Sequence, residues 1–244
     1  MKVIDISKWQ GDKIDWKKVK ASGVDGVIIR AGYGRSITQK DPPFEKNYSG
    51  AIAAGLHVGS YWYSYAASAA EAKTEAAVFQ EAIKGKKFDL PVYYDIEEES
   101  HVQLGKTSCT AMVEAFCVAM ERAGYFCGVY SYDSFFATNL EMPRIQDRYS
   151  CWVACIGSSP QFCTKYGMWQ HSWTGKIDGI SGNVDVDECF KDFVTTITKA
   201  GLNGYGKADT YTVKAEISGV PPETADKISS DCKGLGMTVE KKKD

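Results

Sequence analysis

The sequence predicts an α/β barrel whose first half is regular and whose second half is irregular. Over the first two-thirds of the 244 residues, short apolar strands alternate with amphipathic helices. Strand centres at Val27, Val58, Val92 and Val129 lie 31 to 37 residues apart. This is the length of a βαβ unit, and repeated units imply a parallel sheet. The later strand-like segments have no long helix between them, and the main alternative is a doubly wound open sheet.

Each element follows from a local signal. Apolar runs predict strands at residues 3–6, 27–30, 58–64, 91–97 and 127–131, and later strands at 151–156, 167–170 and 183–187. Amphipathic stripes between the early strands predict helices that stop at glycines 23, 55, 85 and 124. Asp15 is placed to cap the first of these helices, and Ser68 and Glu71 have the spacing of a capping box.

Near residues 201–206 the composition changes to that of a linker. We therefore expect a barrel over residues 1–200 and a small module over residues 205–244. Strands at 210–215 and 237–240 around a helix at 225–228 would give this module a βαβ-like pattern. About 40 residues bury too little surface to be stable alone. The module is thus expected to pack on the barrel, to pair with another copy, or to belong to a longer tail.

Composition excludes several classes of protein. The 29 Lys and Arg residues against 31 Asp and Glu give a net charge of −2, which excludes a nucleic-acid binder held mainly by phosphate contacts. No apolar run is long enough to predict a membrane span. The eight cysteines contain no C-x-x-C and most lie in apolar runs, so we expect reduced core thiols. The three histidines are scattered, and neither a metal nor a cofactor is expected.

The densest chemical signal is the segment that runs from Pro91 to Glu99. Strand side chains alternate between faces, so Asp95 and Glu97 share a face with Tyr93, while Val92 and its alternate neighbours pack against helices. The two acids then point into the barrel, where mutual repulsion raises the pKa of one of them. A raised carboxyl pKa is what a general acid needs. The alternatives are a pair that caps loops or an ion pair with Arg30, and Glu98 and Glu99 are expected in solvent.

Two other strands bring acids to the same face by the same alternation. Asp5 faces away from Ile4 and Ile6, and both Asp185 and Asp187 face away from the valines of their strand. Active sites of barrels lie at the carboxyl ends of the strands. Aromatic residues cluster near these strand ends, and ring faces beside carboxylates suit a carbohydrate. They are Trp9, Tyr33, Tyr61, Trp62, Tyr63, Tyr65, Tyr130, Trp152 and Trp169.

These segments resemble glycoside hydrolase family 25, the Chalaropsis-type lysozymes. The resemblance covers roughly residues 1–195 and is carried, in order, by residues 3–10, 26–34, 58–63, the D-x-E strand at 94–97, and residues 128–131, 152–154, 169–170 and 182–185. It implies a TIM-like (β/α)5(β)3 barrel and an N-acetylmuramidase that cuts the β-1,4 bond from N-acetylmuramic acid to N-acetylglucosamine in bacterial peptidoglycan.

By position in these motifs, Glu97 resembles the general acid of the family, Asp95 its partner, and Asp5 and Asp185 further active-site acids. Residues expected to contact the substrate are Tyr61, Tyr63, Tyr130, Trp152, Gln170, Arg30 and Asp187. Two departures stand out: His171 replaces a common Tyr, and Asp187 replaces a common Asn. Same-face residues two apart on a strand are about 6.5 Å apart at Cα, which leaves retention or inversion open, although net retention with help from the substrate acetamido group is preferred.

Two other functions stay open at this stage, a chitinase-like glycosidase and a non-catalytic glycan-binding barrel. No signal-peptide core precedes the first strand. This is expected of a phage or prophage endolysin that stays in the cytoplasm until it is released to the wall, although a secreted protein with a trimmed start would look the same. The C-terminal module is a candidate for wall targeting or for homo-oligomerisation.

Overall fold

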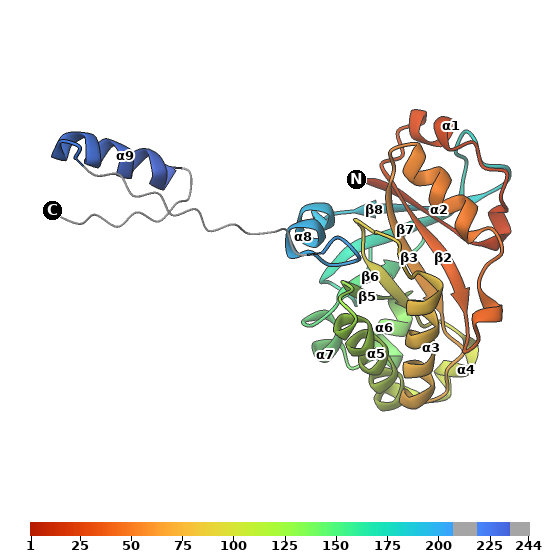
Figure 1. Cartoon of the computed structure of the whole chain (residues 1–244). Helices are drawn as coiled ribbons and strands as arrows, with labels where there is room; N and C mark the ends of the chain where they lie inside the picture. The colour runs from red at the N-terminus through yellow and green to blue at the C-terminus, as the bar shows by residue number, and fades with distance from the viewer. Residues whose placement is uncertain (207–218, 235–244) are drawn as a thin grey trace. The chain divides into compact units, whose positions relative to one another are not determined.

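A computed structural model describes residues 1–206 and 219–234. Eight strands form one closed barrel in which neighbours in the chain are neighbours in the sheet (Figure 1). The strands are β1 (Lys2–Ile6), β2 (Gly26–Tyr33), β3 (His57–Tyr63), β4 (Val92–Asp95), β5 (Cys127–Tyr132), β6 (Ser150–Ala154), β7 (Tyr166–Gly175) and β8 (Val184–Cys189). The predicted α/β barrel is confirmed, and the open doubly wound sheet is wrong.

The pairing of the strands explains the irregular second half. Strands β1 to β7 pair in parallel, whereas β8 is antiparallel to both β7 and β1. An antiparallel partner needs no crossover helix, so β7 and β8 follow each other directly. The strand predicted at 167–170 is in fact ten residues long, and its register against β8 shifts between Gln170 and Ser172 and again before Gly175.

Helices lie in the five connections from β1 to β6, whereas residues 155–165, between the parallel strands β6 and β7, contain no helix (Figure 1). Helix α1 begins after Asp15, whose side chain accepts a hydrogen bond from the Lys18 amide, and α3 begins after Ser68, as predicted. The bounds are η1 (Lys8–Gln10), α1 (Trp16–Ala21), η2 (Ile37–Gln39), α2 (Phe44–Ala53), α3 (Ala69–Ala82), α4 (Glu99–Val102), α5 (Gly105–Arg122), α6 (Asp133–Asn139), α7 (Met142–Gln146), α8 (Phe193–Ala200) and α9 (Pro222–Gly234).

Two apolar clusters form the core, one on each side of the barrel wall. The larger lies between strands and helices and includes Val92, Tyr94 and Ile96. The smaller fills the barrel and includes Tyr93 and Trp152. The alternation predicted for β4 is therefore confirmed, with Tyr93 inside and its neighbours outside. Gly128 makes room for this packing, because a Cβ there would lie 2.6 Å from Cε1 of Tyr93.

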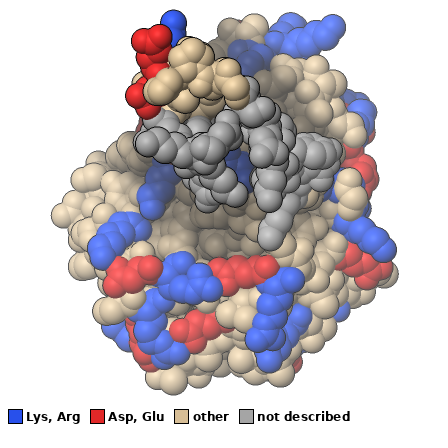
Figure 2. All heavy atoms as spheres, turned by 60° about the vertical axis from the view of Figure 1, so that its left-hand side comes forward, with Lys and Arg blue, Asp and Glu red and all other residues tan. Residues whose placement is uncertain are grey.

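The state of the cysteines and the distribution of surface charge agree with what the composition predicts. All eight cysteines are free; six are buried, and Cys155 and Cys232 are partly exposed. On the face shown in Figure 2, basic side chains lie beside acidic ones. Ion pairs such as Arg144–Glu114 and Arg148–Glu121 have this pattern. Within the described residues, no helix is both long and apolar enough to cross a membrane.

The chain divides into two compact units, Met1–Ala208 and Asp209–Asp244. Residues 201–206 belong to the first unit, where the buried side chain of Asn203 accepts a hydrogen bond from the Phe126 amide and donates one to the Leu90 carbonyl. In the second unit, the helix expected at 225–228 is α9. The strands expected at 210–215 and 237–240 lie outside the described residues.

Candidate active site

A pocket of about 230 Å³ lies at the carboxyl ends of the barrel strands. All eight strands contribute from within their bounds or just beyond them, because the seven parallel strands end at the same rim of the barrel and the antiparallel β8 begins there. The lining residues are Asp5, Ser7, Trp9, Arg30, Tyr61, Tyr63, Asp95, Glu97, Tyr130, Trp152, Gln170 and Asp185. The structure thus brings together ten of the eleven predicted site residues, and Asp187 lies beneath them.

Gln170 connects the amino-terminal acid to the rest of the pocket. Its Nε2 donates to Oδ2 of Asp5 at 2.7 Å, and its Oε1 accepts from the Tyr130 hydroxyl at 2.8 Å. The same Oε1 accepts from Nε1 of Trp173 at 3.0 Å. One amide therefore fixes side chains from β1, β5 and β7. The adjacent His171, which replaces a Tyr common in the resembling family, has its ring 5.6 Å from that of Trp169.

Asp187 is completely buried under the pocket. Its Oδ1 accepts a 2.7 Å hydrogen bond from Nε1 of Trp152, and its Oδ2 has no hydrogen-bond partner among the described residues. Burial raises its pKa well above the ordinary value. Burial likewise raises the pKa of Asp5, and the charges of Asp187 and Asp185 raise it further. Asp187 was expected to contact the substrate, but it supports Trp152 and acts on Asp5 instead.

Glu97 lies two residues beyond the end of β4 and is partly buried at the pocket wall. Burial, together with the charges of Asp185 and Glu98, raises its pKa to about 7, although the nearby hydroxyls of Tyr132 and Tyr130 oppose this rise. One carboxylate oxygen, Oε2, is buried with no hydrogen-bond partner among the described residues. A carboxyl group in this state can hold a proton near neutral pH and release it to a bound molecule.

Asp95 and Asp185, two other acids of the pocket, differ from Glu97 in environment. Asp95 is 3% exposed, and burial followed by the charge of Glu97 raises its pKa well above the ordinary value, while Arg30 opposes the rise. Burial raises the pKa of Asp185 to about 6. Several carboxyl groups with shifted pKa values in one cleft are typical of an acid–base site.

Arg30 does not form an ion pair with the two acids of β4. Its Nε donates to Oδ2 of Asp41 at 2.8 Å, and the Lys8 amide donates to the same oxygen at 2.8 Å. Asp41 is 2% exposed, so this contact ties η1 to β2 at the edge of the pocket. The structural alternative in which Arg30 pairs with Asp95 or Glu97 is therefore wrong.

Two residues at the pocket were missed or misplaced by the sequence. Glu98 was expected in solvent, but it is partly buried and accepts a 2.8 Å hydrogen bond from the Tyr63 hydroxyl. The hydroxyl of Tyr132 lowers the pKa of Glu97. Tyr132 is two residues beyond Tyr130 on β5, so the alternation that predicted Tyr130 also points to it. Among the described residues, no cluster of three or more His, Cys, Asp or Glu side chains could hold a metal ion.

Known proteins are similar to this chain in sequence and in fold. A family profile, Glycosyl hydrolases family 25, matches residues 4–180. The chain belongs to glycosyl hydrolase family 25. It is a glycoside hydrolase of the lysozyme type. The autolytic lysozyme of Clostridium acetobutylicum is 32% identical over 98% of this chain and 75% of its own length.

Solved structures of family 25 enzymes have the same fold. The CTP1L endolysin aligns with all of this chain and 83% of its own, with a TM-score of 0.71 and 26% identity. The modular autolysin LytC from Streptococcus pneumoniae aligns with 76% of this chain, with a TM-score of 0.68 and 32% identity. Only 46% of LytC is covered, so this chain spans less than half of that modular protein.

Proposed function

We propose that this family 25 enzyme hydrolyses the β-1,4 bond from N-acetylmuramic acid to N-acetylglucosamine in bacterial peptidoglycan. The observation that supports the proposal most directly is the pocket itself, in which four carboxyl groups from three distant parts of the chain face one cavity. Relatives named autolytic lysozyme and lysozyme M1 are consistent with this substrate class.

In this proposal Glu97 is the general acid and then the general base. Its pKa of about 7 leaves a large protonated fraction at neutral pH. It protonates the leaving oxygen as the glycosidic bond breaks, and it later takes a proton from the water that attacks the anomeric carbon. Positive charge develops on the sugar ring in the transition state, and the carboxylates of the pocket stabilise it.

Asp95 orients the 2-acetamido group of the substrate in the same proposal. The acetamido oxygen attacks the anomeric carbon, the leaving oxygen takes the proton of Glu97, and Asp95 accepts the amide hydrogen bond as positive charge forms. Water then attacks from the opposite face and gives a proton to Glu97, while the bond from the anomeric carbon to the acetamido oxygen breaks, which restores the original anomeric configuration. Asp5 and Asp185 complete the acidic wall, and Tyr61, Tyr63, Tyr130 and Trp152 line the sugar site.

Mass spectrometry of borohydride-reduced fragments from purified walls tests the proposal. Reduction marks the new reducing end, so muramitol at that end supports a muramidase, and glucosaminitol contradicts it. Digestion of chitin oligomers without release from walls would instead favour a chitinase-like enzyme. Binding to walls with no fragment released would favour a glycan-binding barrel. Proton NMR of the first-formed product distinguishes retention from inversion.

The second unit is proposed to target the wall or to join copies of the chain. The alignment with the autolytic lysozyme covers 98% of the chain and therefore extends into residues 209–244. An endolysin that is held in the cytoplasm until release, or an exported autolysin, would both use such a unit. Fractionation of producing cells before and after lysis tests which of the two applies.

A further inference from the structure

A second cavity of about 310 Å³ adjoins the acidic pocket. Trp9, Arg30 and Tyr63 line both cavities, so the two are continuous. The second cavity adds Lys8, Tyr33 and Tyr65 and contains no acidic lining residue. Its character is therefore opposite to that of the catalytic pocket: two cations among four aromatic rings lie beside four carboxyl groups.

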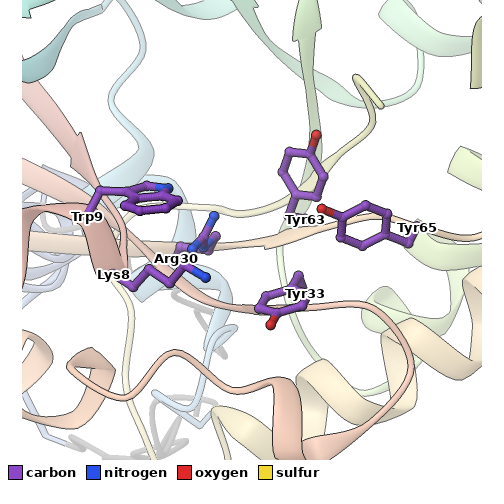
Figure 3. Close-up of a pocket in the computed structure, with 6 residues that line it drawn as sticks. All are labelled: Lys8, Trp9, Arg30, Tyr33, Tyr63 and Tyr65. Atoms are coloured by element: carbon purple, nitrogen blue, oxygen red, sulfur yellow. The ribbon is translucent and has the colours of Figure 1, made fainter. Parts of the chain in front are cut away.

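Both cations point into this cavity. Figure 3 shows Lys8 and Arg30 extending toward the space between Trp9 and the tyrosines. The ammonium of Lys8 lies 5.0 Å from the ring centroid of Trp9 and 5.5 Å from that of Tyr33. The guanidinium of Arg30 lies 5.8 Å from the Tyr33 ring. Cation–π contacts of this kind attract and orient a cation. The charge of Arg30 is paired with Asp41, so Lys8 is the cation of this cavity whose charge can act on a ligand.

The backbone and side-chain contacts beneath the two cations are rigid. Asp41 binds the amide of Lys8 and Nε of Arg30 through one oxygen. Ser7 and Gln10 form a capping box that fixes η1, the short helix that contains Lys8 and Trp9. Nη2 of Arg30 is buried and has no hydrogen-bond partner among the described residues, and no described carboxylate forms an ion pair with Lys8. Within the described residues, the site thus has an unused donor on Arg30 and an unpaired ammonium on Lys8, whose backbone is held by Asp41.

From this juxtaposition we infer that the cavity is a subsite for the free glutamyl carboxylate of the peptide stem attached to muramic acid, with Lys8 as the residue that selects it. This inference rests on the proposed muramidase function. The stem leaves the sugar through the 3-O-lactyl group, so a muramic acid ring in the acidic pocket has its acidic peptide beside that pocket, within reach of the adjoining cavity. An ammonium between aromatic rings matches a carboxylate on a partly apolar chain.

Three glycan substrates separate the stem carboxylate from other anions. The first carries stems with a free glutamyl carboxylate, the second has that carboxylate amidated, and the third has lost its stems and exposes the lactyl carboxylate. We expect Lys8→Glu to lower kcat/KM about tenfold on the first substrate and less than about twofold on the others, because like charges repel across the subsite. Lys8→Arg, which keeps the positive charge, should retain most of the wild-type kcat/KM on the first substrate.

The control is Lys20→Glu, which makes the same change of net charge at an exposed position of α1 that lines neither cavity. It should leave all three rates as in the wild type. The Lys8→Glu defect should also shrink at 0.5 M salt, because an exposed ion pair is screened. Equal losses on the first two substrates would overturn the inference. So would a loss on the stripped strands as large as that on the first substrate, since the anion would then be the lactyl group.

Binding measured without turnover separates this inference from the proposed function. Calorimetry with Glu97→Gln and Glu97→Gln/Lys8→Glu, titrated with stem-bearing and amidated strands, reports affinity alone. About tenfold weaker binding of only the acidic strands by the double variant supports the subsite, even if the wild type releases no muramitol. Equal affinities of the two variants for the acidic strands would overturn it, even if the wild type is a muramidase.

Discussion

The side-chain amide of Gln170 donates a 2.7 Å hydrogen bond to Asp5, although 165 positions separate the two residues in the chain. The contact exists because β8 closes the barrel between β7 and β1. It places Asp5 in a buried cluster with Asp185 and Asp187, where the charge of each neighbour raises the pKa of Asp5. The ionisation of this cluster therefore affects both stability and catalysis.

Replacement of Asp187 by Asn, the residue common at this position in the family, should stabilise the enzyme at neutral and alkaline pH. The folded-state pKa of Asp187 is raised, so its contribution to stability is present below the ordinary pKa and is lost as the pH rises. Asn cannot ionise, and its Oδ1 can still accept from Trp152. We expect Tm at pH 8 to rise by about 2–4 °C, the shift that about 1 kcal/mol gives in a domain of this size.

Thermal unfolding at pH 5 and pH 8 checks this prediction. The gain of Asp187→Asn over the wild type should be larger at pH 8. Asp178→Asn, at an exposed position, serves as the control and should shift Tm equally little at both pH values. A gain that is the same at both pH values would mean that packing, rather than ionisation, sets the effect.

Glu97→Gln should reduce wall lysis by about 10²- to 10⁴-fold, the range that general acid–base catalysis contributes. It should also stabilise the fold at alkaline pH. The Glu97 pKa rises from 4.5 to about 7 on folding, so stability is lost as the pH rises through about 7. The difference is on the order of 3 kcal/mol for this partly buried group. Turbidity assays and Tm measurements at pH 5 and 8 check both effects, with the exposed Glu99→Gln as the matched control.

The fall in kcat/KM at alkaline pH, which is the alkaline limb of the pH–rate profile, should reflect the ionisation of Glu97, and its midpoint should depend on the charge of Asp185. An acid must be protonated to act, so kcat/KM should fall above about pH 7. Because the charge of Asp185 raises the Glu97 pKa, Asp185→Asn should move this limb to lower pH, whatever its effect on the maximal rate. Profiles on soluble strands from pH 4 to 9 measure the midpoint. A midpoint that moves upward, or that stays in place, contradicts the assignment of the limb to Glu97.

Side-chain alternation predicted most of the site, and it failed where strands end or bend. Asp5 and Asp95 lie within strands, so the period of two placed them correctly. Glu98 lies beyond β4, where alternation no longer determines direction, and it turns back to Tyr63. Trp173 reaches Gln170 only because the register of β7 shifts. No sequence pattern predicts such a shift, since it depends on the twist and closure of the whole barrel.

Contacts between residues that are far apart in the sequence were also not predicted. Asp41 lies 33 positions from Lys8 and 11 from Arg30, in a segment without periodicity, and it organises both cations. Helix α8 was also missed, although Asp192 caps it by accepting from the Thr195 amide. The sequence signals of this helix are its capping residue and its eight helical residues. Eight residues are too few for periodicity to distinguish a helix from a loop.

Asp41→Asn should destabilise the fold by about 3 kcal/mol, because it leaves the buried Arg30 guanidinium without its carboxylate partner. Asp12→Asn removes an exposed carboxylate that pairs with Lys46, and it should change stability little. Urea unfolding of both variants at pH 7 gives the comparison. Equal, small effects would show that the Asp41–Arg30 pair adds nothing beyond a surface ion pair.

Removal of residues 209–244 should leave the catalytic unit folded and active on soluble strands. The truncation keeps Asn203, whose side chain binds the backbones of Leu90 and Phe126, and it ends where the first compact unit ends. If the second unit targets the wall, the truncated enzyme should bind purified walls at least tenfold more weakly. If it joins copies, the solution mass by light scattering should fall to that of one chain.

A deletion that stops before residue 203 is the contrasting control, and it should lower Tm because Phe126 and Leu90 lose their partner. Unchanged wall binding together with an unchanged oligomeric state would refute both proposed roles.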